Sequence, residues 1–345
     1  MTIGSFDLKG DRVFIIAELS ANHNGSLEVA LKTVEAAKEA GADAIKLQTY
    51  TAQTLTLDCK REDFVIGGGT LWDGKTMYEL YDEAHTPWEW HEELFAHARA
   101  LGLEVFSTPF DQSAVDFLER FDPPAYKIAS FEITDHELIR YAASKGRPMI
   151  ISTGIATIGE IQEAVDICRQ EGNDEIVLLK CTSAYPAPLE EANLRTIPNL
   201  AETFGVVAGF SDHTLGITAP VAAVALGAKV IEKHFILDKS LGGPDAAFSL
   251  DKEEFTAMVD AVRQTEKLLG RVDYAMTEKK KKSRQFARSL YVAEDIAEGE
   301  RFTLKNVRSV RPGYGLHPRY LPQILGKRAC RPLKKGDRLR WEDIG

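Results

Sequence analysis

The feature that most constrains the fold is a strand–helix rhythm that recurs along the first 270 residues. Short apolar runs typical of buried strands alternate with stretches whose apolar residues follow helical spacing. The predicted strands are residues 13–19, 44–49, 104–108, 125–130, 148–153, 176–182, 206–211 and 230–235. The predicted helices include residues 27–37 after a cap at Ser26, then 88–100, 113–120, 136–144, 158–169, 219–226 and 252–269 after a cap near Asp251. Eight such units favour a (β/α)8 TIM barrel over an open doubly wound sheet.

A different composition follows the barrel pattern. Residues 279–284 read KKKKSR, a charge run typical of a solvated linker, with a nucleic-acid patch as a poor second interpretation. Beyond it, short strand-like runs and turns without helical spacing indicate a small, mostly β domain. We therefore predict a barrel domain over residues 1–275, a linker over 276–288 and the β domain over 289–345.

One connection within the barrel is much longer than the others. Residues 51–86 link the second and third predicted strands and contain three successive glycines at 67–69 together with Trp72, Tyr78 and Tyr81. Long loops on the C-terminal face of a barrel are often lids or binding loops, and the aromatic side chains argue against a floppy surface excursion. We expect a lid or binding loop here.

Composition narrows the possible partners and the compartment. The net charge of −10 argues against nucleic-acid binding, so an anionic substrate would be met by locally placed Lys, Arg and backbone N–H groups. The four cysteines form no CxxC pair, which favours reduced thiols in a cytoplasmic protein. The first ten residues lack an apolar signal core, and no run is long enough to span a membrane.

Polar side chains stand at the ends of the predicted strands, which meet at one mouth in a barrel. A lysine within a buried strand is costly unless it is paired or meets an anion. Lys46 and Lys127, with hydroxyl groups nearby, therefore predict a phosphate site, because both kinds of group donate to phosphate oxygens. The alternative is that these lysines pair with Glu18 or Glu232 and hold the barrel closed.

Two histidines end neighbouring predicted strands. His213 follows the seventh strand and His234 lies in the eighth, so both are expected to face one pocket. A pair of imidazoles in a polar pocket is a candidate metal site, whereas a lone histidine on a strand is more often a satisfied core residue. A Schiff-base aldolase centred on Lys180 is a second hypothesis, but it leaves both histidines unexplained. A non-catalytic sugar-binding protein is a third, and the dense polar ring at the mouth argues against it.

Several short motifs together resemble the sialic acid synthase family. They are IAE (16–18), NHNG (22–25), KLQ (46–48), STPFD (107–111), KIAS (127–130), STG (152–154), GFSDHT (209–214) and EKHF (232–235). The C-terminal part is similar to the antifreeze-like (SAF) domain of that family, with RPG (311–313) as its most recognisable segment. Each motif alone is weak, but the combination spans the whole chain and is specific.

Within the family, the resemblance is greatest to the branch that makes pseudaminic acid. It rests on GGTLWDG (68–74), YELY (78–81), AHTPWEW (84–90), GPDAAFSL (243–250) and RPGYGLHP (311–318). N-acetylneuraminate synthases usually carry an asparagine after the sixth strand, where this chain has TSAYP (182–186). That departure disfavours N-acetylmannosamine as substrate. An N-acetylneuraminate or legionaminic acid synthase that uses a manno-configured sugar remains the alternative.

The resemblance implies a transferase reaction. Phosphoenolpyruvate would condense with the open-chain aldehyde of a 2,4-diacetamido-2,4,6-trideoxy-altropyranose and water, giving pseudaminic acid and phosphate. His213 and His234 would hold a divalent metal, Mn²⁺ with Mg²⁺ or Co²⁺ as substitutes, which acts as a Lewis acid on the aldehyde. The protein would work in the cytoplasm as a domain-swapped homodimer, without nucleic-acid or membrane partners.

The matching positions also imply roles for individual residues. Phosphoenolpyruvate would be held by Lys46, Thr108, Lys127, Ser130, Ser152 and Ser211. The sugar would be held by Gln48, Tyr185, Asp245 and Arg311, the last contributed by the other subunit. Glu132 is the candidate for activating water, and Glu18 for contacting a sugar hydroxyl or a metal-bound water.

Overall fold

The structure is a computed structural model that describes residues 1–69 and 72–345. These residues divide into two compact units, Met1–Gly270 and Arg271–Gly345. Thr70 and Leu71, which belong to the GGTLWDG motif, lie outside the described residues. Within the described ranges, none of the helices combines the length and the apolar character that a bilayer crossing requires.

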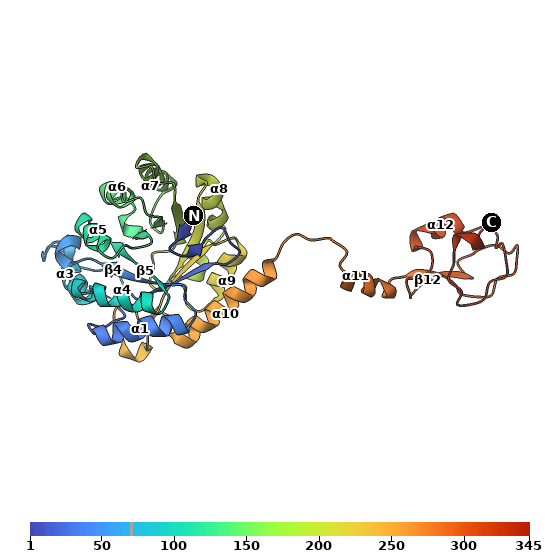
Figure 1. The fold of residues 1–345 in the computed structure, drawn as a ribbon, viewed down its shortest axis with the longest axis horizontal. Coiled ribbons are helices and arrows are strands. Elements are labelled where there is room, and N and C mark those ends of the chain that lie inside the picture. Colours follow the sequence, from blue (N-terminus) through green and yellow to red (C-terminus); the bar gives the residue numbers. More distant parts are fainter. Residues whose placement is uncertain (70–71) are drawn as a thin grey trace. The chain divides into compact units, whose positions relative to one another are not determined.

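Eight parallel strands close into a barrel that is surrounded by helices (Figure 1). Each strand pairs with the next one along the chain, and the last strand closes the ring by pairing with the first. The strands are β3 (Phe14–Glu18), β4 (Ala44–Thr49), β5 (Glu104–Pro109), β6 (Tyr126–Ile128), β7 (Met149–Ser152), β8 (Ile176–Cys181), β9 (Val207–Asp212) and β10 (Val230–His234). The predicted barrel is confirmed, and every predicted strand is present to within two residues at either end.

The longer helices of the first unit surround the strands, and most of them begin at a side-chain cap that is visible in the sequence. They are α1 (Leu27–Glu39), α4 (His91–Ala100), α5 (Gln112–Glu119), α6 (His136–Ala143), α7 (Ile158–Gln170), α8 (Thr196–Phe204), α9 (Thr218–Ala225) and α10 (Lys252–Leu269). Ser26 accepts a hydrogen bond from the backbone of α1, and Asp251 forms a capping box with Glu254, as predicted for both helix starts. Helix α8 was not predicted; its first turn contains Pro198, a residue that helices tolerate there.

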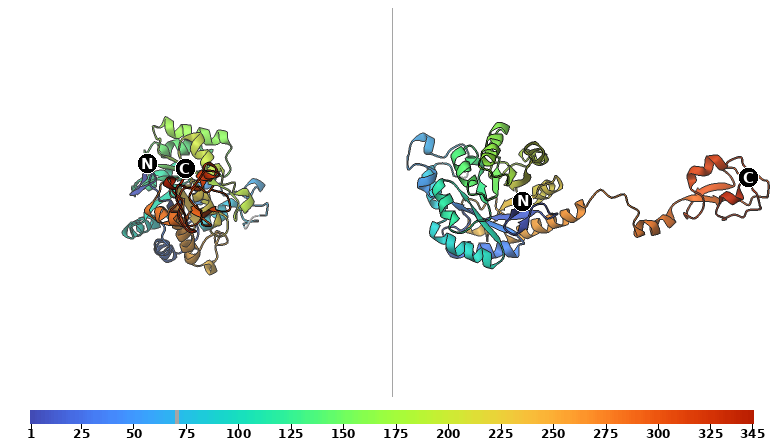
Figure 2. Two further views of the ribbon diagram at one scale, coloured as in Figure 1. Left: turned by 90° about the vertical axis from the view of Figure 1, so that its right-hand side faces the viewer. Right: turned by 45° about the horizontal axis from the view of Figure 1, so that its top comes forward.

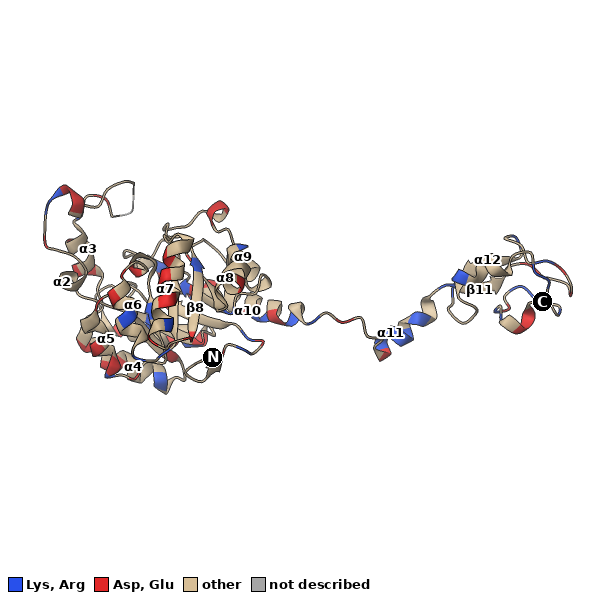
Figure 3. Ribbon diagram, turned by 90° about the horizontal axis from the view of Figure 1, so that it is seen from above, with Lys and Arg blue, Asp and Glu red and all other residues tan. Residues whose placement is uncertain are grey.

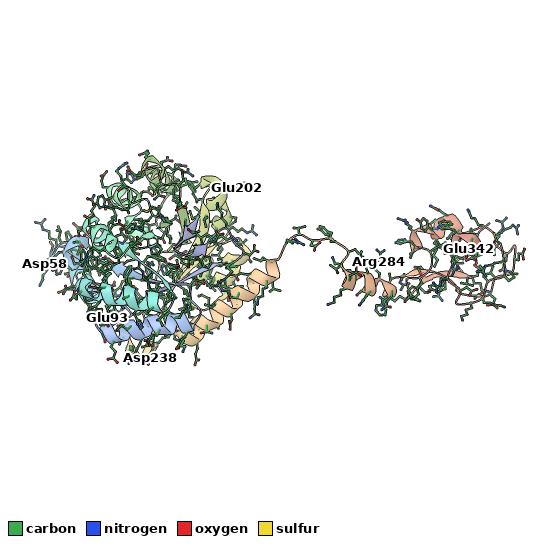
Figure 4. All side chains as sticks on the ribbon, viewed as in Figure 1. Asp58, Glu93, Glu202, Asp238, Arg284 and Glu342 are labelled. Carbon is green, nitrogen blue, oxygen red and sulfur yellow. The ribbon has the colours of Figure 1, made fainter. Side chains whose placement is uncertain are left out.

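Two apolar clusters, one inside the barrel and one outside it, show to which face of the barrel each strand side chain points. The larger cluster lies between the strands and the helices, and the smaller one fills the inside of the barrel. A short N-terminal hairpin, β1 (Thr2–Ile3) and β2 (Phe6–Asp7), adds Ile3 and Phe6 to the inner cluster. Two further views show the same helices around the strands (Figure 2). The side chains of Glu93 and Glu202 point outward from the helices, away from the strands (Figure 4).

The long connection after β4 is partly helical. It contains α2 (Ala52–Leu55), a 3₁₀ turn at Glu62–Phe64 and α3 (Met77–Ala84). Thr51 and Thr76 form capping boxes that begin α2 and α3. A hydrogen bond from Gln53 to the Tyr78 hydroxyl joins the two short helices. The segment predicted as a lid or binding loop therefore has internal order.

The second unit has a small sheet and a core of its own. Strands β11 (Ser289–Val292) and β12 (Val307–Val310) pair antiparallel, followed by α12 (Leu321–Ile324). Leu290, Phe302 and Val307 are among the residues of its buried cluster. The lysine run forms the short helix α11 (Glu278–Ser283), whose residues are all exposed (Figure 3). The observed architecture agrees with the predicted small β domain.

Candidate active site

Inside the barrel, the apolar core gives way to polar side chains at the C-terminal ends of the strands. Ile16 and Val230 belong to the inner core, and Glu18 and Glu232 lie two residues further along the same strands. Because strand side chains alternate between the two faces, residues two apart share the inside of the barrel. The inward-facing set is Glu18, Lys46, Gln48, Thr108, Lys127, Ser152, Cys181, Ser211, Glu232 and His234.

Two lysines and two glutamates of this set form one buried ion-paired network. Lys46 Nζ lies 2.8 Å from Glu18 Oε2 and 3.7 Å from Glu232 Oε1. Lys127 Nζ lies 3.5 Å from the same Glu232 oxygen. Lys46 also donates to Thr108 Oγ1 over 3.1 Å. The pairing that the sequence offered as an alternative to a phosphate site is therefore present, and the side chains of both lysines are almost completely buried.

The two glutamates respond differently to their surroundings. Burial raises the pKa of Glu18 to about 7, and the neighbouring Lys46 offsets this effect only in part. Burial acts on Glu232 as well, but Lys127 and Lys46 outweigh it and hold the pKa of Glu232 below its ordinary value. Glu232 therefore stays ionised between the lysines, whereas Glu18 takes up a proton as the pH falls below about 7.

The two predicted histidines meet at the mouth, with ring centres 5.3 Å apart. His213 Nδ1 lies 3.0 Å from the carbonyl oxygen of Thr182, which assigns the proton to Nδ1 and leaves the lone pair on Nε2. His234 Nδ1 is buried and has no hydrogen-bond partner within residues 1–69 and 72–345. Burial lowers the pKa of His234 well below its ordinary value and keeps this ring neutral. Burial also acts to lower the pKa of His213, but Cys181 and the Thr182 carbonyl oxygen outweigh it and raise that pKa above its ordinary value.

These two rings are candidate ligands of a divalent metal ion. Neutral imidazoles with an unused nitrogen are common ligands of transition metals. In the described ranges, no three His, Cys, Asp or Glu side chains are spaced to hold a metal ion together. His213 and His234 would be the candidate protein ligands of such a site.

A buried ion pair lies behind the histidines, on the helix-facing side of the strands. Lys233 Nζ lies 2.6 Å from Asp212 Oδ2, both side chains are completely buried, and the two residues are cross-strand neighbours on β9 and β10. Lys233 also donates to the carbonyl oxygen of Thr214. Because each partner immediately precedes one histidine, the pair fixes the strand ends that carry His213 and His234. The sequence analysis did not identify this pair.

Replacing Lys233 by methionine is expected to lower the free energy of unfolding by about 3–5 kcal/mol, because Asp212 would stay buried without its counter-charge. Urea unfolding followed by circular dichroism measures the loss. The matched control is Lys32→Met, which removes an exposed i,i+4 pair with Glu28 and should leave the free energy of unfolding close to that of wild type. Equal losses in the two variants would contradict a stabilising role for the buried pair.

A pocket of about 440 Å³ opens at this mouth. Four residues predicted for the sugar or for water line it together with His234; they are Gln48, Glu132, Tyr185 and Asp245. Asp245 accepts hydrogen bonds from the Ser20 hydroxyl and from the Ala21 N–H, which joins the loops that follow β3 and β10. Asp245 Oδ2 also lies 3.8 Å from His234 Nδ1. Side chains from the long connection after β4 form much of the remaining wall and were not predicted individually.

Several polar atoms near the pocket lack a partner within the described ranges. Ser152 Oγ and Glu132 Oε2 are buried and make no hydrogen bond there. Burial raises the pKa of Glu132 to about 7. Ser130 Oγ accepts from the Gly154 N–H over 3.1 Å. An unsatisfied buried polar atom costs free energy, so a bound ligand that meets Ser152 or Glu132 would be stabilised.

Lys180 does not join the other predicted residues. It lies between Leu179 and Cys181, which face the inside, so its own side chain starts on the outer face of β8. Its Nζ donates to the carbonyl oxygen of Cys181 over 2.6 Å, and it is not among the residues that line the pocket. The Schiff-base alternative therefore lacks an inward-facing lysine at this position. Cys181, which was not singled out, faces inward instead, with Sγ 3.7 Å from His213 Nδ1.

Arg311 belongs to the second unit. It is exposed, and within the described residues no hydrogen bond or ion pair engages its guanidinium group. Its contact with the sugar stays a prediction.

Known proteins resemble both parts of the chain. The NeuB family matches residues 33–274, and the SAF domain matches residues 287–345. The chain is 54% identical over 344 residues to the pseudaminic acid synthase of Campylobacter jejuni, covering 100% of both chains. It is 40% identical to the N,N'-diacetyllegionaminic acid synthase of Legionella pneumophila, covering 96% of this chain and 94% of that one. A crystal structure of an N-acetylneuraminic acid synthetase from Leptospira borgpetersenii, in complex with citrate, superposes with a TM-score of 0.71 at 31% identity, covering 79% of this chain and 91% of that chain.

Proposed function

This chain belongs to the NeuB family, and on that premise we propose that it is a pseudaminic acid synthase. It condenses phosphoenolpyruvate with the open-chain aldehyde of 2,4-diacetamido-2,4,6-trideoxy-altropyranose and water, and it releases phosphate. The observation that carries the proposal is the 54% identity to a pseudaminic acid synthase over the whole length of both chains. The buried lysine pair beside the two histidines supports it, because an anionic substrate and an electrophile then share one mouth.

Phosphoenolpyruvate occupies the inward-facing polar set in this proposal. Lys46 and Lys127 offer their charges, and the hydroxyl groups of Thr108, Ser130, Ser152 and Ser211 donate to its phosphate and carboxylate oxygens. The buried Ser152 hydroxyl, which has no partner in the described ranges, gains one. Glu18, whose pKa is about 7, takes up a proton as the anion binds and thereby leaves Lys46 to the phosphate.

Glu132 acts as the general base. It lies in the same pocket as His234, and its pKa of about 7 suits proton transfer near neutral pH. As C3 of phosphoenolpyruvate bonds to the aldehyde carbon, Glu132 takes a proton from the water that adds to C2. The C2 hydroxyl then loses its proton as C2 expels phosphate, whose charge the two lysines hold, and the 2-keto acid remains. The aldehyde oxygen, now an alkoxide, takes up the proton that Glu132 removed from water.

His213 and His234 hold a divalent metal, Mn²⁺ with Mg²⁺ or Co²⁺ as substitutes, which acts as a Lewis acid on the aldehyde oxygen when bound. His234 Nδ1, which has no hydrogen-bond partner in the described ranges, and His213 Nε2, which keeps its lone pair when Nδ1 carries the proton, support this assignment. Gln48, Tyr185 and Asp245 orient the sugar, since all three line the pocket around His234. Glu18 accepts a hydrogen bond from Gln48 over 2.9 Å, so the Gln48 side chain connects it to the proposed sugar site.

A panel of sugars tests the proposal. With phosphoenolpyruvate and Mn²⁺, the altro-configured diacetamido sugar should release phosphate at least about tenfold faster than its manno-configured counterpart or N-acetylmannosamine. Phosphate release and mass spectrometry of the nine-carbon product measure the outcome. Faster turnover of a manno-configured sugar would replace the proposal by a legionaminic acid or N-acetylneuraminate synthase, which the 40% identity to a diacetyllegionaminic acid synthase makes the second candidate.

The proposed working form is a domain-swapped homodimer in the cytoplasm. Exposed apolar side chains on the loops that follow the strands, among them Phe131, Ile155 and Leu215, provide a surface for a second copy to cover. The partner's SAF domain brings Arg311 to the acetamido end of the sugar, and the exposed, unengaged guanidinium supports this role. All four cysteines are free thiols, as expected in a reducing compartment.

Mixing two inactive variants tests the sharing of Arg311 between chains. Arg311→Ala and a barrel variant such as Glu132→Gln should each be inactive alone. After they are mixed in equal amounts, unfolded together and refolded, about a quarter of wild-type activity should return, because about half of the dimers are mixed and each mixed dimer holds one intact site. Phosphate release measures the recovery, and each variant refolded alone is the control. No recovery from a mixture that forms mixed dimers would place Arg311 in its own subunit's site or outside the site.

A further inference from the structure

The pocket at the barrel mouth has two chemically different ends. Around His234, the wall is polar and contains Gln48, Glu132 and Asp245. Beyond the strand ends, the loops and short helices contribute the apolar residues Leu55, Met77, Leu80 and Phe110 to the same pocket, and we call this part of its lining the outer wall. Leu55 and Met77 come from the ends of α2 and α3, Leu80 from the middle of α3, and Phe110 from the residue after β5.

The outer wall is held in place by its surroundings. Leu80 is 8% exposed and is the buried residue of α3. Tyr50 packs edge-on against both Phe110 and Tyr81, with ring centres 5.1 Å and 6.0 Å away. Trp88 Nε1 donates to the carbonyl oxygen of Tyr50 over 3.1 Å. The apolar surface therefore belongs to the fold of the pocket rather than to a stray side chain.

A half-buried apolar surface inside a binding pocket is best covered by an apolar part of the ligand. Leu55, Met77 and Phe110 are each half-buried, so part of each side chain faces the pocket. On the proposed function, the aldehyde carbon of the sugar must lie at the polar end beside His234. The other end of the sugar chain, its C6, then extends toward the outer wall.

We propose that the outer wall is a subsite for a terminal methyl group and that it selects 6-deoxy sugars over sugars with a 6-hydroxyl. This inference rests on the proposed function, because the reacting aldehyde fixes which end of the sugar is outermost. A methyl group gains by leaving water at such a wall, whereas a hydroxymethyl group must give up a hydrogen bond to water without receiving one. Discrimination in an apolar pocket of this kind reaches about 10- to 100-fold.

Two near-isosteric changes test the subsite. Met77→Gln and Leu55→Asn keep the size of each side chain but add an amide at the wall. The measurement is the ratio of kcat/KM for two sugars that share configuration and acetamido groups and differ only in a 6-methyl or a 6-hydroxymethyl group. Wild-type protein should favour the 6-deoxy sugar about 10- to 100-fold, and the double variant should bring the ratio to within about threefold. The KM for phosphoenolpyruvate should stay within about twofold of wild type.

The control is Leu57→Asn, which alters the same connection at a residue that is 65% exposed and does not line the pocket. It should keep the wild-type ratio. A ratio that is the same in the double variant and in wild type would overturn the subsite, even if both rates fell. Loss of the dimer in the double variant together with an unchanged ratio would instead make the wall a packing surface.

The subsite and the proposed function fail in different ways. If wild-type protein releases no phosphate with either sugar, the proposed function fails. The subsite is then read from calorimetric binding of the two corresponding alditols, which have no aldehyde to react. Tighter binding of the 6-deoxy alditol by at least about tenfold, lost in the double variant, supports the subsite, and equal affinities overturn it.

Discussion

Glu132→Gln is expected to lower kcat by about 10²- to 10⁴-fold while the affinity for phosphoenolpyruvate stays within about threefold of wild type. The amide keeps the size of the side chain but cannot take a proton from water. Glu132 lines the pocket and, within the described residues, forms no ion pair with Lys46 or Lys127, which are proposed to bind phosphoenolpyruvate, so binding of that substrate should survive. Steady-state phosphate release gives kcat, and calorimetry gives the affinity.

The pH dependence sharpens this prediction. Burial raises the pKa of Glu132 to about 7, so the carboxylate form that can act as a base grows as the pH rises from 6 to 8. The rate should therefore rise almost tenfold per pH unit below about 7 and level off above it, and Glu132→Gln should lose this limb. Glu202→Gln, at an exposed position on α8, is the control and should match wild type. Normal turnover by Glu132→Gln would remove this residue from the mechanism.

The barrel could be predicted because its physical causes are local. Strands buried on both faces read as short apolar runs, and the helices between them carry caps such as Ser26 and Asp251 that are visible in the sequence. The period of two along a strand also places Glu18, Lys46 and His234 on the inside once the strand bounds are known. The site residues that lie on the barrel strands therefore come together at the C-terminal ends of the strands, as predicted.

The parts that the sequence left open depend on partners far away in the chain. Whether Lys46 pairs with a carboxylate or stays available to bind an anion depends on Glu18 and Glu232, which lie on two other strands. The Lys233–Asp212 pair could not be predicted, because the sequence alone does not say whether a charged residue on a strand faces inward or outward. The outer wall is harder still to predict, since Leu55 and Met77 lie in a connection that has no long run of helical or strand periodicity.

Removing divalent ions is expected to lower the rate of condensation by about 10²- to 10³-fold, and Mn²⁺ should restore it. A metal that polarises the aldehyde is worth several kcal/mol in the transition state, and about 1.4 kcal/mol corresponds to a tenfold change in rate. Phosphate release after chelation and dialysis measures the loss. Full-speed condensation by protein depleted of divalent ions would contradict the role proposed for the two histidines.

Replacing one histidine separates loss of the metal from loss of the fold. His234→Ala removes the ring whose buried Nδ1 has no partner in the described ranges, so Mn²⁺ should neither bind tightly nor rescue activity. His136→Ala, an exposed position on α6 paired with Glu163, should behave as wild type. Electron paramagnetic resonance counts bound Mn²⁺ directly, which makes the result independent of turnover. Because His234 lies next to the Lys233–Asp212 pair rather than within it, His234→Ala should unfold at nearly the wild-type urea concentration, and its loss of Mn²⁺ then reflects a missing ligand.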